Sequence, residues 1–497
     1  MAEKLNSVQE FYKNKTIFIT GSSGFMGKVF IEKLLYSCSD LKQLILLMRP
    51  KRGKSQLERI KEFEKLPLFE RIMKEKSEVM KKIFIVSGEI TEPNLGMSKE
   101  NLQYVIDNTN IIFHLAASLK LEATVRPNIC MNLIATKEVL DIAKNVKKLA
   151  VMVHVSTAFC NVEKVTVDEV VYDTPEKPMD VINTAKWMDD DFMASFQKQL
   201  LGIHPNSYTY SKRLAEVLVR DEYNETKLPL CIVRPSVVGA SYSEPVKGWI
   251  DTLNGPGGVV LAGGKGVLRC LLIDDSAIFN AIPVDYAINS FIMIAKEIGT
   301  QKERASKVPV YNVTIHKSVA KSYRHMMDAC ESMRYVFPSS MMLWYPNITL
   351  TKNKYYYMFN VILFQWIPAI FIDLLFMIFG QKRFMIHVQK KIAVGMDVLK
   401  CFTLNNWDFR TKNFEHLTEI QSKDEYEMFF VDTKKIDINQ YYKDSLAGGR
   451  VYKDKDPLST IPKAIRLMKI LYVLDRSVKI IFFYFVIKKL LTLTGLL

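Results

Sequence analysis

A strand, a glycine-rich turn and a helix follow one another near the start of the chain, and this order constrains the fold most strongly. Residues 16–20 form a β-branched run, residues 20–27 read TGSSGFMG, and residues 28–38 carry apolar side chains at helical spacing. Glycines let backbone turn tightly and approach a pyrophosphate, whose charge lies at the next helix N-terminus. This strand-to-helix context favours a dinucleotide site over a merely tight turn. The predicted site residues are Thr20, Gly21, Ser23, Gly24, Phe25, Met26 and Gly27.

Apolar strand patterns alternate with helical patterns along the first half of the chain. Strand-like runs occur at 41–49, 81–90, 111–118, 149–159 and 230–240, with helical patterns at about 54–80, 132–146 and 208–225. Such alternation implies a parallel sheet with helices on both faces. The expected fold class is therefore α/β, a doubly wound sheet of the Rossmann type.

The ends of the second, third and fourth strand patterns supply further candidates for the cofactor site. An NAD enzyme usually offers a carboxylate to the ribose at the end of its second strand, whereas this chain offers Arg49, Lys51 and Arg52. Guanidinium groups there suit a 2′-phosphate, so NADPH is favoured over NADH; the alternative is a solvated basic loop. Glu89 and Ile90 are expected to border the adenine, and Ala116 the nicotinamide side of the groove.

Tyr208 and Lys212 stand four residues apart at the start of a helical pattern, in the stretch NSYTYSK. At this spacing both side chains lie on one face of a helix. A tyrosine titrates near pH 10, and moving its pKa to about 7 with a neighbouring ammonium requires roughly 4 kcal/mol of interaction. Such a phenol can protonate a carbonyl oxygen as hydride reaches the carbon. The pair is predicted to be catalytic; the alternative is an exposed helix pair.

The strand before this helix ends in two hydroxyl side chains. Thr157 is the preferred partner for the substrate oxygen and Ser156 the second choice, against the alternative that either hydroxyl satisfies a local turn. Cys160 raises a rival chemistry through a thioester on the enzyme, but nothing nearby in the sequence lowers its pKa, so an inert buried cysteine is expected. His114 and His154 lie in apolar strands and are interpreted as core histidines.

Composition limits the classes of partner. The 497 residues suggest two or three domains, and a net charge of +15 suits acidic partners such as coenzyme phosphates or anionic lipid; nucleic acid ranks last because no zinc-knuckle or RNP pattern occurs. Seven cysteines stand singly, which favours a reducing compartment. The polar N-terminus contains no secretory signal, so a cytosolic catalytic part is expected. No metal is predicted, because no histidine pair has ligand spacing.

The texture of the sequence changes after about residue 350. Residues 355–380 are apolar and long enough to cross a bilayer, yet they contain Asn360, Gln365, Pro368 and Asp373. Residues 450–497 hold ten Lys and Arg against three Asp and end in an apolar run. These features indicate a tail that lies on or re-enters a membrane, with a buried helix of a C-terminal bundle as the alternative for each stretch.

The motifs TGSSGFMG and YxxxK resemble those of the extended short-chain dehydrogenase/reductase superfamily, and further blocks resemble its fatty acyl-CoA reductase branch. These blocks are the charged insertion LMRPKRGKSQLERIKEFEKLPLFERI, the stretches HVSTAFCN and PNSYTYSK, and the long RPSVVGASYSEPVKGWIDTLNGPGG. Later segments, YYYMFNVILFQWIPAIFIDLLFM and LNNWDF, are similar to the family's helical C-terminal domain. The resemblance covers about 18–450. Glu89 stands where the family more often has aspartate.

This resemblance implies an NADPH-dependent reduction of long-chain fatty acyl-CoA to a primary alcohol through an aldehyde, with release of CoA. It implies that Tyr208 and Lys212 are catalytic and that Lys212 also orients the nicotinamide ribose. The expected domains are a reductase at 1–350, a helical domain at 351–450 and a membrane-associated tail at 451–497. The endoplasmic reticulum is the first choice of membrane, before peroxisome and lipid droplet. Alternatives are a reductase for a sterol or other lipid carbonyl, one that stops at the aldehyde, and a non-catalytic membrane-tethered nucleotide-binding scaffold.

Overall fold

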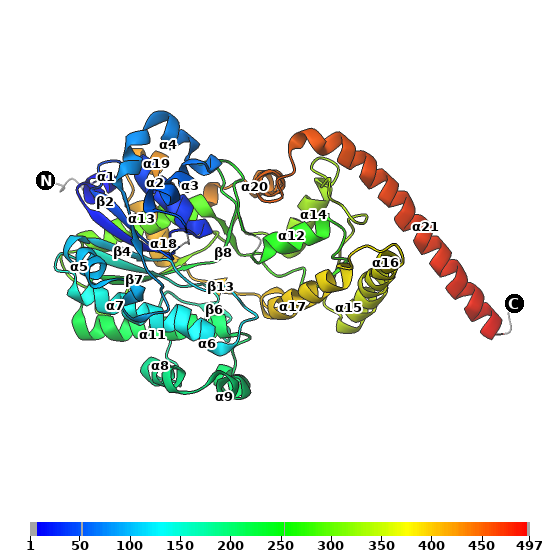
Figure 1. Ribbon diagram of the computed structural model, residues 1–497, viewed down its shortest axis with the longest axis horizontal. Helices are drawn as coiled ribbons and strands as arrows, with labels where there is room; N and C mark the ends of the chain where they lie inside the picture. Colours follow the sequence, from blue (N-terminus) through cyan, green and yellow to red (C-terminus); the bar gives the residue numbers. More distant parts are fainter. Residues whose placement is uncertain (1–6, 51–52, 253, 495–497) are drawn as a thin grey trace. The chain divides into compact units, whose positions relative to one another are not determined.

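The computed structural model describes residues 7–50, 53–252 and 254–494, which form two compact units (Figure 1). The first unit comprises the described residues up to Ile250 together with 280–320 and 406–441, and the second comprises 251–279, 321–405 and the residues from 442 onward. The chain therefore passes between the units several times. The functional division expected at residues 350 and 450 stays a prediction.

A seven-stranded parallel sheet forms the centre of the first unit. Its order is β11 (Val310–Val313), β7 (Leu230–Pro235), β5 (Val151–Val155), β4 (Ile111–His114), β1 (Thr16–Thr20), β2 (Gln43–Met48) and β3 (Ile83–Ser87). Nearly all residues of the inner strands are buried, as expected of a parallel sheet covered on both faces. The predicted Rossmann-type α/β fold is confirmed, and the strand order reverses between β1 and β4, where such sheets bind ligands.

Helices cover both faces of this sheet. One face packs against α7 (Ala135–Asn145) and α11 (Ser207–Thr226), which share one large apolar cluster with Ile112 and Met152. The opposite face packs against α2 (Phe25–Ser37) and α13 (Val284–Thr300), with the Phe30 ring 4.5 Å from the Phe113 ring. Helices α11 and α2 therefore lie on opposite faces of the sheet.

Shorter elements complete the first unit. They are α1 (Val8–Tyr12), α3 (Gln56–Glu64), α4 (Glu70–Glu75), α5 (Lys99–Asn108), α6 (Val125–Asn128), the π-helix η4 (Ile129–Ile134), α8 (Pro178–Trp187), α9 (Asp190–Ser195), α10 (Gln197–Leu201), α18 (Lys412–Glu419) and α19 (Lys423–Met428). Two strand pairs join β8 (Val237–Gly239) with β10 (Ala281–Pro283) and β6 (Thr166–Val167) with β13 (Asp408–Phe409). The insertion expected as one helical stretch at 54–80 contains α3, α4 and short 3₁₀ turns.

The second unit is mostly helical. It contains α12 (Pro256–Gly264), α14 (Tyr323–Ser332), α15 (Lys354–Val361), the π-helix η5 (Ile362–Trp366), α16 (Ile367–Ile378), α17 (Met385–Leu404) and α21 (Ile461–Leu493), with the parallel pair β9 (Cys270–Leu272) and β12 (Thr349–Thr351). Helix α20 (Ile438–Gly448) carries the chain across the boundary between the units. Among the described residues, one continuous helix, Lys354–Ile378, is long and apolar enough to cross a membrane.

Candidate active site

The glycine turn leaves no room for a side chain at Gly21 or Gly27. A Cβ at Gly21 would lie 2.7 Å from the Ala116 backbone nitrogen, and a Cβ at Gly27 would lie 2.3 Å from the Gly21 carbonyl oxygen. Gly21 also adopts a φ of +76°, which favours glycine. Helix α2 begins at Phe25 after Gly24, and no side chain caps its first amides. The turn is thus a cradle of exposed backbone amides at a helix N-terminus, which suits a pyrophosphate.

Side chains around the turn hold it to the strand ends. The Thr20 hydroxyl contacts His114 Nδ1 at 2.8 Å and accepts from the Ala116 amide at 3.3 Å, and the Ser22 hydroxyl donates to the Leu47 carbonyl at 3.1 Å. The structure therefore brings Thr20 and Ala116 together as predicted, at the point where the strand order reverses.

The segment that follows β8 is also fixed against α2. Trp249 is buried, and its ring stacks on that of Phe25 with centroids 5.5 Å apart and planes at 18°. Asp285, at the start of α13, accepts from the backbone amides of Tyr242 and Ser243 at 2.9 and 2.8 Å. The contact between Phe25 and Trp249 could not be predicted from local patterns, because it joins positions more than 200 residues apart.

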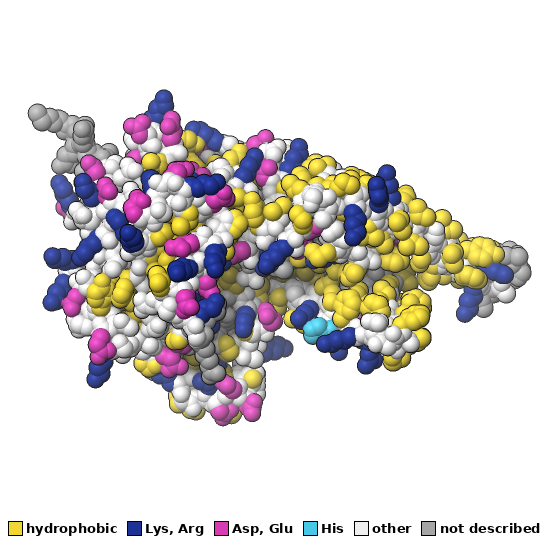
Figure 2. All heavy atoms as spheres, turned by 45° about the horizontal axis from the view of Figure 1, so that its top comes forward, with side chains coloured by type: hydrophobic (Ala, Val, Ile, Leu, Met, Phe, Trp, Pro, Cys, Tyr) yellow, Lys and Arg dark blue, Asp and Glu magenta, His cyan; other side chains and the backbone are white. Residues whose placement is uncertain are grey.

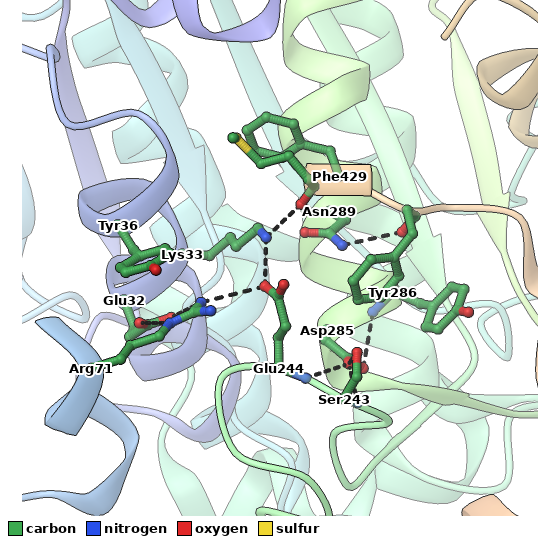
Figure 3. A network of polar contacts seen from close by, with 12 residues as sticks. Glu32, Lys33, Tyr36, Arg71, Ser243, Glu244, Asp285, Tyr286, Asn289 and Phe429 are labelled. Carbon is green, nitrogen blue, oxygen red and sulfur yellow. Dashed lines mark hydrogen bonds and ion pairs between the residues drawn. The ribbon is translucent and has the colours of Figure 1, made fainter. Parts of the chain in front are cut away.

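A buried charge network completes this attachment (Figure 3). Glu244 accepts from Lys33 at 2.6 Å and from Arg71 at 3.3 Å, and Arg71 forms a two-pronged ion pair with Glu32 at 2.7 and 2.9 Å. Burial raises the pKa of Glu32, and the Arg71 hydrogen bond opposes that shift. The network therefore links the charged insertion, α2 and the segment after β8, which keeps the N-terminus of α2 in place.

The predicted phosphate contacts at the end of β2 are partly described. Arg49 is mostly exposed and pairs with Glu89, at 2.9 Å between Nε and Oε2. Lys51 and Arg52 lie outside the described residues. Ile90 is buried in the core beside the same strand end. Arg49 and Glu89 thus meet at the edge of the expected adenosine site.

The first turns of α11 are held by polar contacts from the neighbouring helix. Asn128 and Asn132, both fully buried, donate to the hydroxyls of Ser207 and Ser211 at 2.7 and 2.9 Å. These bonds set the rotation of α11 about its axis. Tyr208 is half-buried and Lys212 is buried, one turn apart on that helix as predicted.

The three predicted catalytic side chains form one group, and the structure separates the two hydroxyl candidates. The Thr157 side chain hydrogen-bonds the Tyr208 phenol. Ser156 instead lies 4.0 Å from the Cys160 sulfur. The Lys212 ammonium donates to the Val155 carbonyl at 2.7 Å. Thr157 is therefore the hydroxyl that lies beside the phenol.

The pKa values of this group differ from the expected lowering of the tyrosine by the lysine. Burial raises the pKa of Tyr208 above its usual value, and the hydrogen bond from Thr157 opposes this shift only in part. Burial lowers the pKa of Lys212 to about 8, while Glu216 opposes that shift. Burial dominates the pKa of Tyr208, so at neutral pH the phenol keeps its proton and can donate it.

His154 is a neighbour of Lys212 that the sequence did not reveal. Its Nε2 lies 3.4 Å from the Lys212 ammonium, and the residue is fully buried. Burial, and next the nearby Lys212 charge, lower the pKa of His154 well below its usual value, so the ring is neutral. A neutral Nε2 can accept from the ammonium. The two residues meet because α11 packs beside β5. The alternation of strand and helix patterns in the sequence already predicted that His154 lies in a buried strand.

A buried ion pair lies behind the lysine. Arg234 and Glu216 are almost fully buried and join at 2.8 and 2.6 Å, and Cys160 donates to Glu216 at 3.3 Å. Burial, followed by the Glu216 charge, raises the pKa of Cys160 far above its usual value. This thiol stays protonated, which agrees with the expected inert cysteine.

Comparisons with known proteins identify relatives of this chain. Two family models, both described as male sterility protein, match residues 19–291 and 364–456. Fatty acyl-CoA reductase 1 of *Xenopus laevis* is 35% identical over 458 residues, covering 92% of this chain and 88% of that protein. Fatty acyl-CoA reductase 1 of *Homo sapiens* is 33% identical, with 92% and 88% covered.

Solved structures share the fold. The terminal R domain of the myxalamid PKS-NRPS pathway matches with a TM-score of 0.59 at 16% identity, covering 88% of this chain and 91% of that chain. The reductase domain of a nonribosomal peptide synthetase from *Mycobacterium tuberculosis* matches with a TM-score of 0.54 at 15% identity, covering 83% and 86%. The extent and identity of the sequence matches show that this chain belongs to the fatty acyl-CoA reductase family.

Proposed function

We propose that this protein reduces long-chain fatty acyl-CoA to primary fatty alcohol with NADPH and releases CoA. The observation that carries the proposal is the group formed by Tyr208, Thr157 and Lys212 on a sheet whose glycine turn forms an open amide cradle. The relatives of this chain bear the name of that activity. Each substrate accepts two hydrides and two protons, so that one thioester gives one alcohol and one free thiol.

The residues of the glycine turn fit a dinucleotide. A Cβ at either Gly21 or Gly27 would clash with backbone, which is expected where a diphosphate needs the peptide groups themselves. Gly24 to Gly27 would hold the diphosphate, Ala116 would border the nicotinamide, and Lys212 would bind the nicotinamide ribose. When bound, the reduced cofactor supplies hydride to the carbonyl carbon.

The side chains then supply the proton and stabilise the developing negative charge. The protonated Tyr208 phenol and the Thr157 hydroxyl stabilise the carbonyl oxygen, and Tyr208 donates its proton there. The hydroxyl of the resulting hemithioacetal returns its proton to Tyr208 as the C–S bond breaks, the CoA thiolate takes a proton from solvent, and the aldehyde remains. The same phenol then serves the second reduction, in which the aldehyde becomes the alcohol. Lys212 keeps a positive charge near the phenol while that proton moves.

We assign NADPH over NADH because of the charge at the end of β2. Arg49 is exposed there, and Glu89, which follows the neighbouring strand β3, forms an ion pair with it. A 2′-phosphate would take the guanidinium over from the carboxylate, with two charges in place of one. Arg49→Ala is expected to raise the KM for NADPH about tenfold and leave the KM for NADH unchanged.

We further propose that the protein acts at a membrane, with the endoplasmic reticulum as first choice. An acyl chain partitions into bilayers, so attachment raises the local substrate concentration. The helix Lys354–Ile378 and the exposed apolar part of α21 support attachment. Carbonate extraction of cell fractions tests both the attachment and the organelle.

The activity is tested with purified full-length protein, palmitoyl-CoA and NADPH. The expected products are hexadecanol and CoA, with two NADPH consumed per CoA released. Consumption of one NADPH would show a reductase that stops at the aldehyde. Binding of NADPH without oxidation across a panel of acyl-CoA and sterol ketones would leave only a nucleotide-binding scaffold.

A matched pair of variants tests the acid. Tyr208→Phe removes the assigned proton donor, and the rate is expected to fall at least 100-fold. Tyr210 lies two residues away on α11, is buried, and has a hydroxyl without a hydrogen-bond partner among the described residues. Tyr210→Phe is therefore the control and should keep the full rate. Full activity in Tyr208→Phe would overturn the assignment.

A further inference from the structure

The helix Lys354–Ile378 has its polar side chains inside and its apolar side chains outside. From residue 355 to 378 the exposed side chains are Tyr355, Tyr356, Met358, Phe359, Ile362, Ile367, Ile370, Phe371, Leu374, Met377 and Ile378. Its buried side chains are Asn360, Gln365, Ala369 and Asp373. A helix on the surface of a soluble domain shows the opposite arrangement. This reversal indicates an apolar medium around the outer face.

A π-helical turn makes the reversal possible. From Asn360 the regular spacing of four would place residue 364 on the inner face. The π-helix η5 inserts one residue, so that Gln365 takes this place, and Ala369 and Asp373 follow at intervals of four. The polar side chains are thus aligned on a single stripe, and every exposed position between them is apolar.

Side chains of the polar stripe accept hydrogen bonds from backbone amides of the second unit. Gln365 accepts from the backbone amides of Arg269 and Cys270 at 2.7 and 3.3 Å. Asp373 accepts from the amides of Met385 and Ile386 at the start of α17, each at 2.9 Å. These contacts fix one side of the helix to a strand and to a second helix. The helix therefore cannot rotate or separate without breaking buried hydrogen bonds.

Arg269, the residue just before β9, also holds α21 beside this helix. The Arg269 guanidinium pairs with Asp475 of α21 at 2.9 Å, and Lys479 lies over the Phe364 ring at 5.7 Å. Beyond Asp475 the side chains of α21 are almost all exposed, and most of them are apolar. Figure 2 shows hydrophobic side chains, in yellow, gathered over α16 and α21.

The charges around the helix argue against a crossing. The helix has 25 residues, about 37 Å, so its length alone would permit one. However, α17 packs against α16 and exposes Lys390 and Lys391. If α16 crossed a bilayer, α17 would share its depth and place two ammonium groups in hydrocarbon, which is strongly unfavourable. A helix parallel to the surface leaves these groups among the lipid head groups.

We infer that the helix Lys354–Ile378 lies in the plane of the membrane, with its outer face buried in one leaflet beside the exposed part of α21. The occupant of this apolar face is a lipid bilayer with anionic head groups, which the surrounding lysines complement. The inference rests on the proposed membrane attachment and adds how this helix is attached: both of its ends lie on one side of the bilayer.

Accessibility of the two helix flanks tests this orientation. The full chain, with Cys130, Cys330 and Cys401 replaced by serine, receives either Asn353→Cys or Lys382→Cys and is translated into sealed microsomes. A membrane-impermeant maleimide is then added from the cytosolic side. Both flanks are expected to react fully without detergent. Protection of either flank until detergent is added would mean a crossing helix and overturn the inference.

Depth along the helix gives a second, independent measurement. Ile362→Cys, Ile370→Cys and Ile378→Cys carry a fluorophore, and lipids carry a quencher near the head group or at the chain end. An in-plane helix gives the same quenching ratio at all three positions. A progressive change of the ratio from Ile362 to Ile378 would contradict the proposal, even if a flank variant failed to fold.

A charge on the outer face tests the occupant. Ile370→Asp with Phe371→Asp is expected to weaken binding to phosphatidylcholine vesicles containing phosphatidylserine about tenfold or more. Leu57→Asp, at an exposed position on α3, is the control and should bind as wild type. Unchanged vesicle binding, or a dimer that these two substitutions dissociate, would show a different occupant. Alcohol formation in detergent is recorded separately, so that failure of the catalytic proposal is distinguished from failure of this one.

Discussion

Buried polar groups have different consequences in the two units of this protein. In the first unit an apolar sheet carries a small set of buried ionisable groups, of which His154 and Glu216 lie near Lys212. In the second unit the buried polar side chains Gln365 and Asp373 accept from backbone amides, and the apolar side chains face outward. Burial of a charge changes a pKa in the first unit, whereas burial of polar groups in the second fixes which surface is exposed.

Breaking one buried ion pair in each unit should give the largest difference between the units. Arg234→Met leaves Glu216 buried without its cation, and the free energy of unfolding should fall by about 3–5 kcal/mol. Arg269→Met leaves Asp475 with Lys479 and the Trp344 indole, both at 2.8 Å, so a loss of about 1–2 kcal/mol is expected. Urea unfolding followed by circular dichroism measures both. Equal losses in the free energy of unfolding would contradict this expected difference between the two ion pairs.

A glycine substitution should be harmful in the first unit and favourable in the second: one weakens NADPH binding, and the other raises the stability of the protein. Gly27→Ala places a methyl group against the Gly21 carbonyl, and NADPH binding should weaken about 10- to 100-fold as the turn shifts. Gly395→Ala, in the middle of α17, meets no atom within 4 Å and should stabilise the protein by about 0.5–1 kcal/mol. Nucleotide titration and thermal unfolding are the measurements. Unchanged NADPH affinity in Gly27→Ala would show that the cofactor does not use this turn.

The pH dependence should report the buried lysine of the first unit. Because the folded pKa of Lys212 is about 8, activity should fall about tenfold per pH unit above that value as the ammonium is lost. The folded pKa lies below the unfolded value near 10.4, so the unfolded chain binds more protons between these pH values, and the contribution of Lys212 to stability rises with pH there. Rate profiles in the full-length enzyme check the first statement. A rate that stays constant to pH 10 would contradict it.

The local patterns predicted much of the first unit and little of the second. The glycine turn, the alternating strands and the spacing of Tyr208 and Lys212 are properties of short segments, and the structure has them where expected. The pKa of Tyr208 could not be predicted, since it depends on burial by distant segments. For 355–380 the polar residues were visible in the sequence, but their common inward stripe depends on the π-helical turn and on what covers that side.

Substitution of His154 should have the smallest effect and tests how the first unit sets the pKa of Lys212. Its neutral Nε2 is one of two acceptors near the Lys212 ammonium, the other being the Val155 carbonyl. His154→Phe removes this acceptor, so the pKa of Lys212 should fall further, and the alkaline limb of the rate should move to lower pH by up to about one unit, the equivalent of one hydrogen bond to a charged group. His154→Gln keeps an acceptor in reach and should restore the limb. If both variants lose rate equally at every pH, His154 only fills space, because a packing role does not change with the protonation of the lysine.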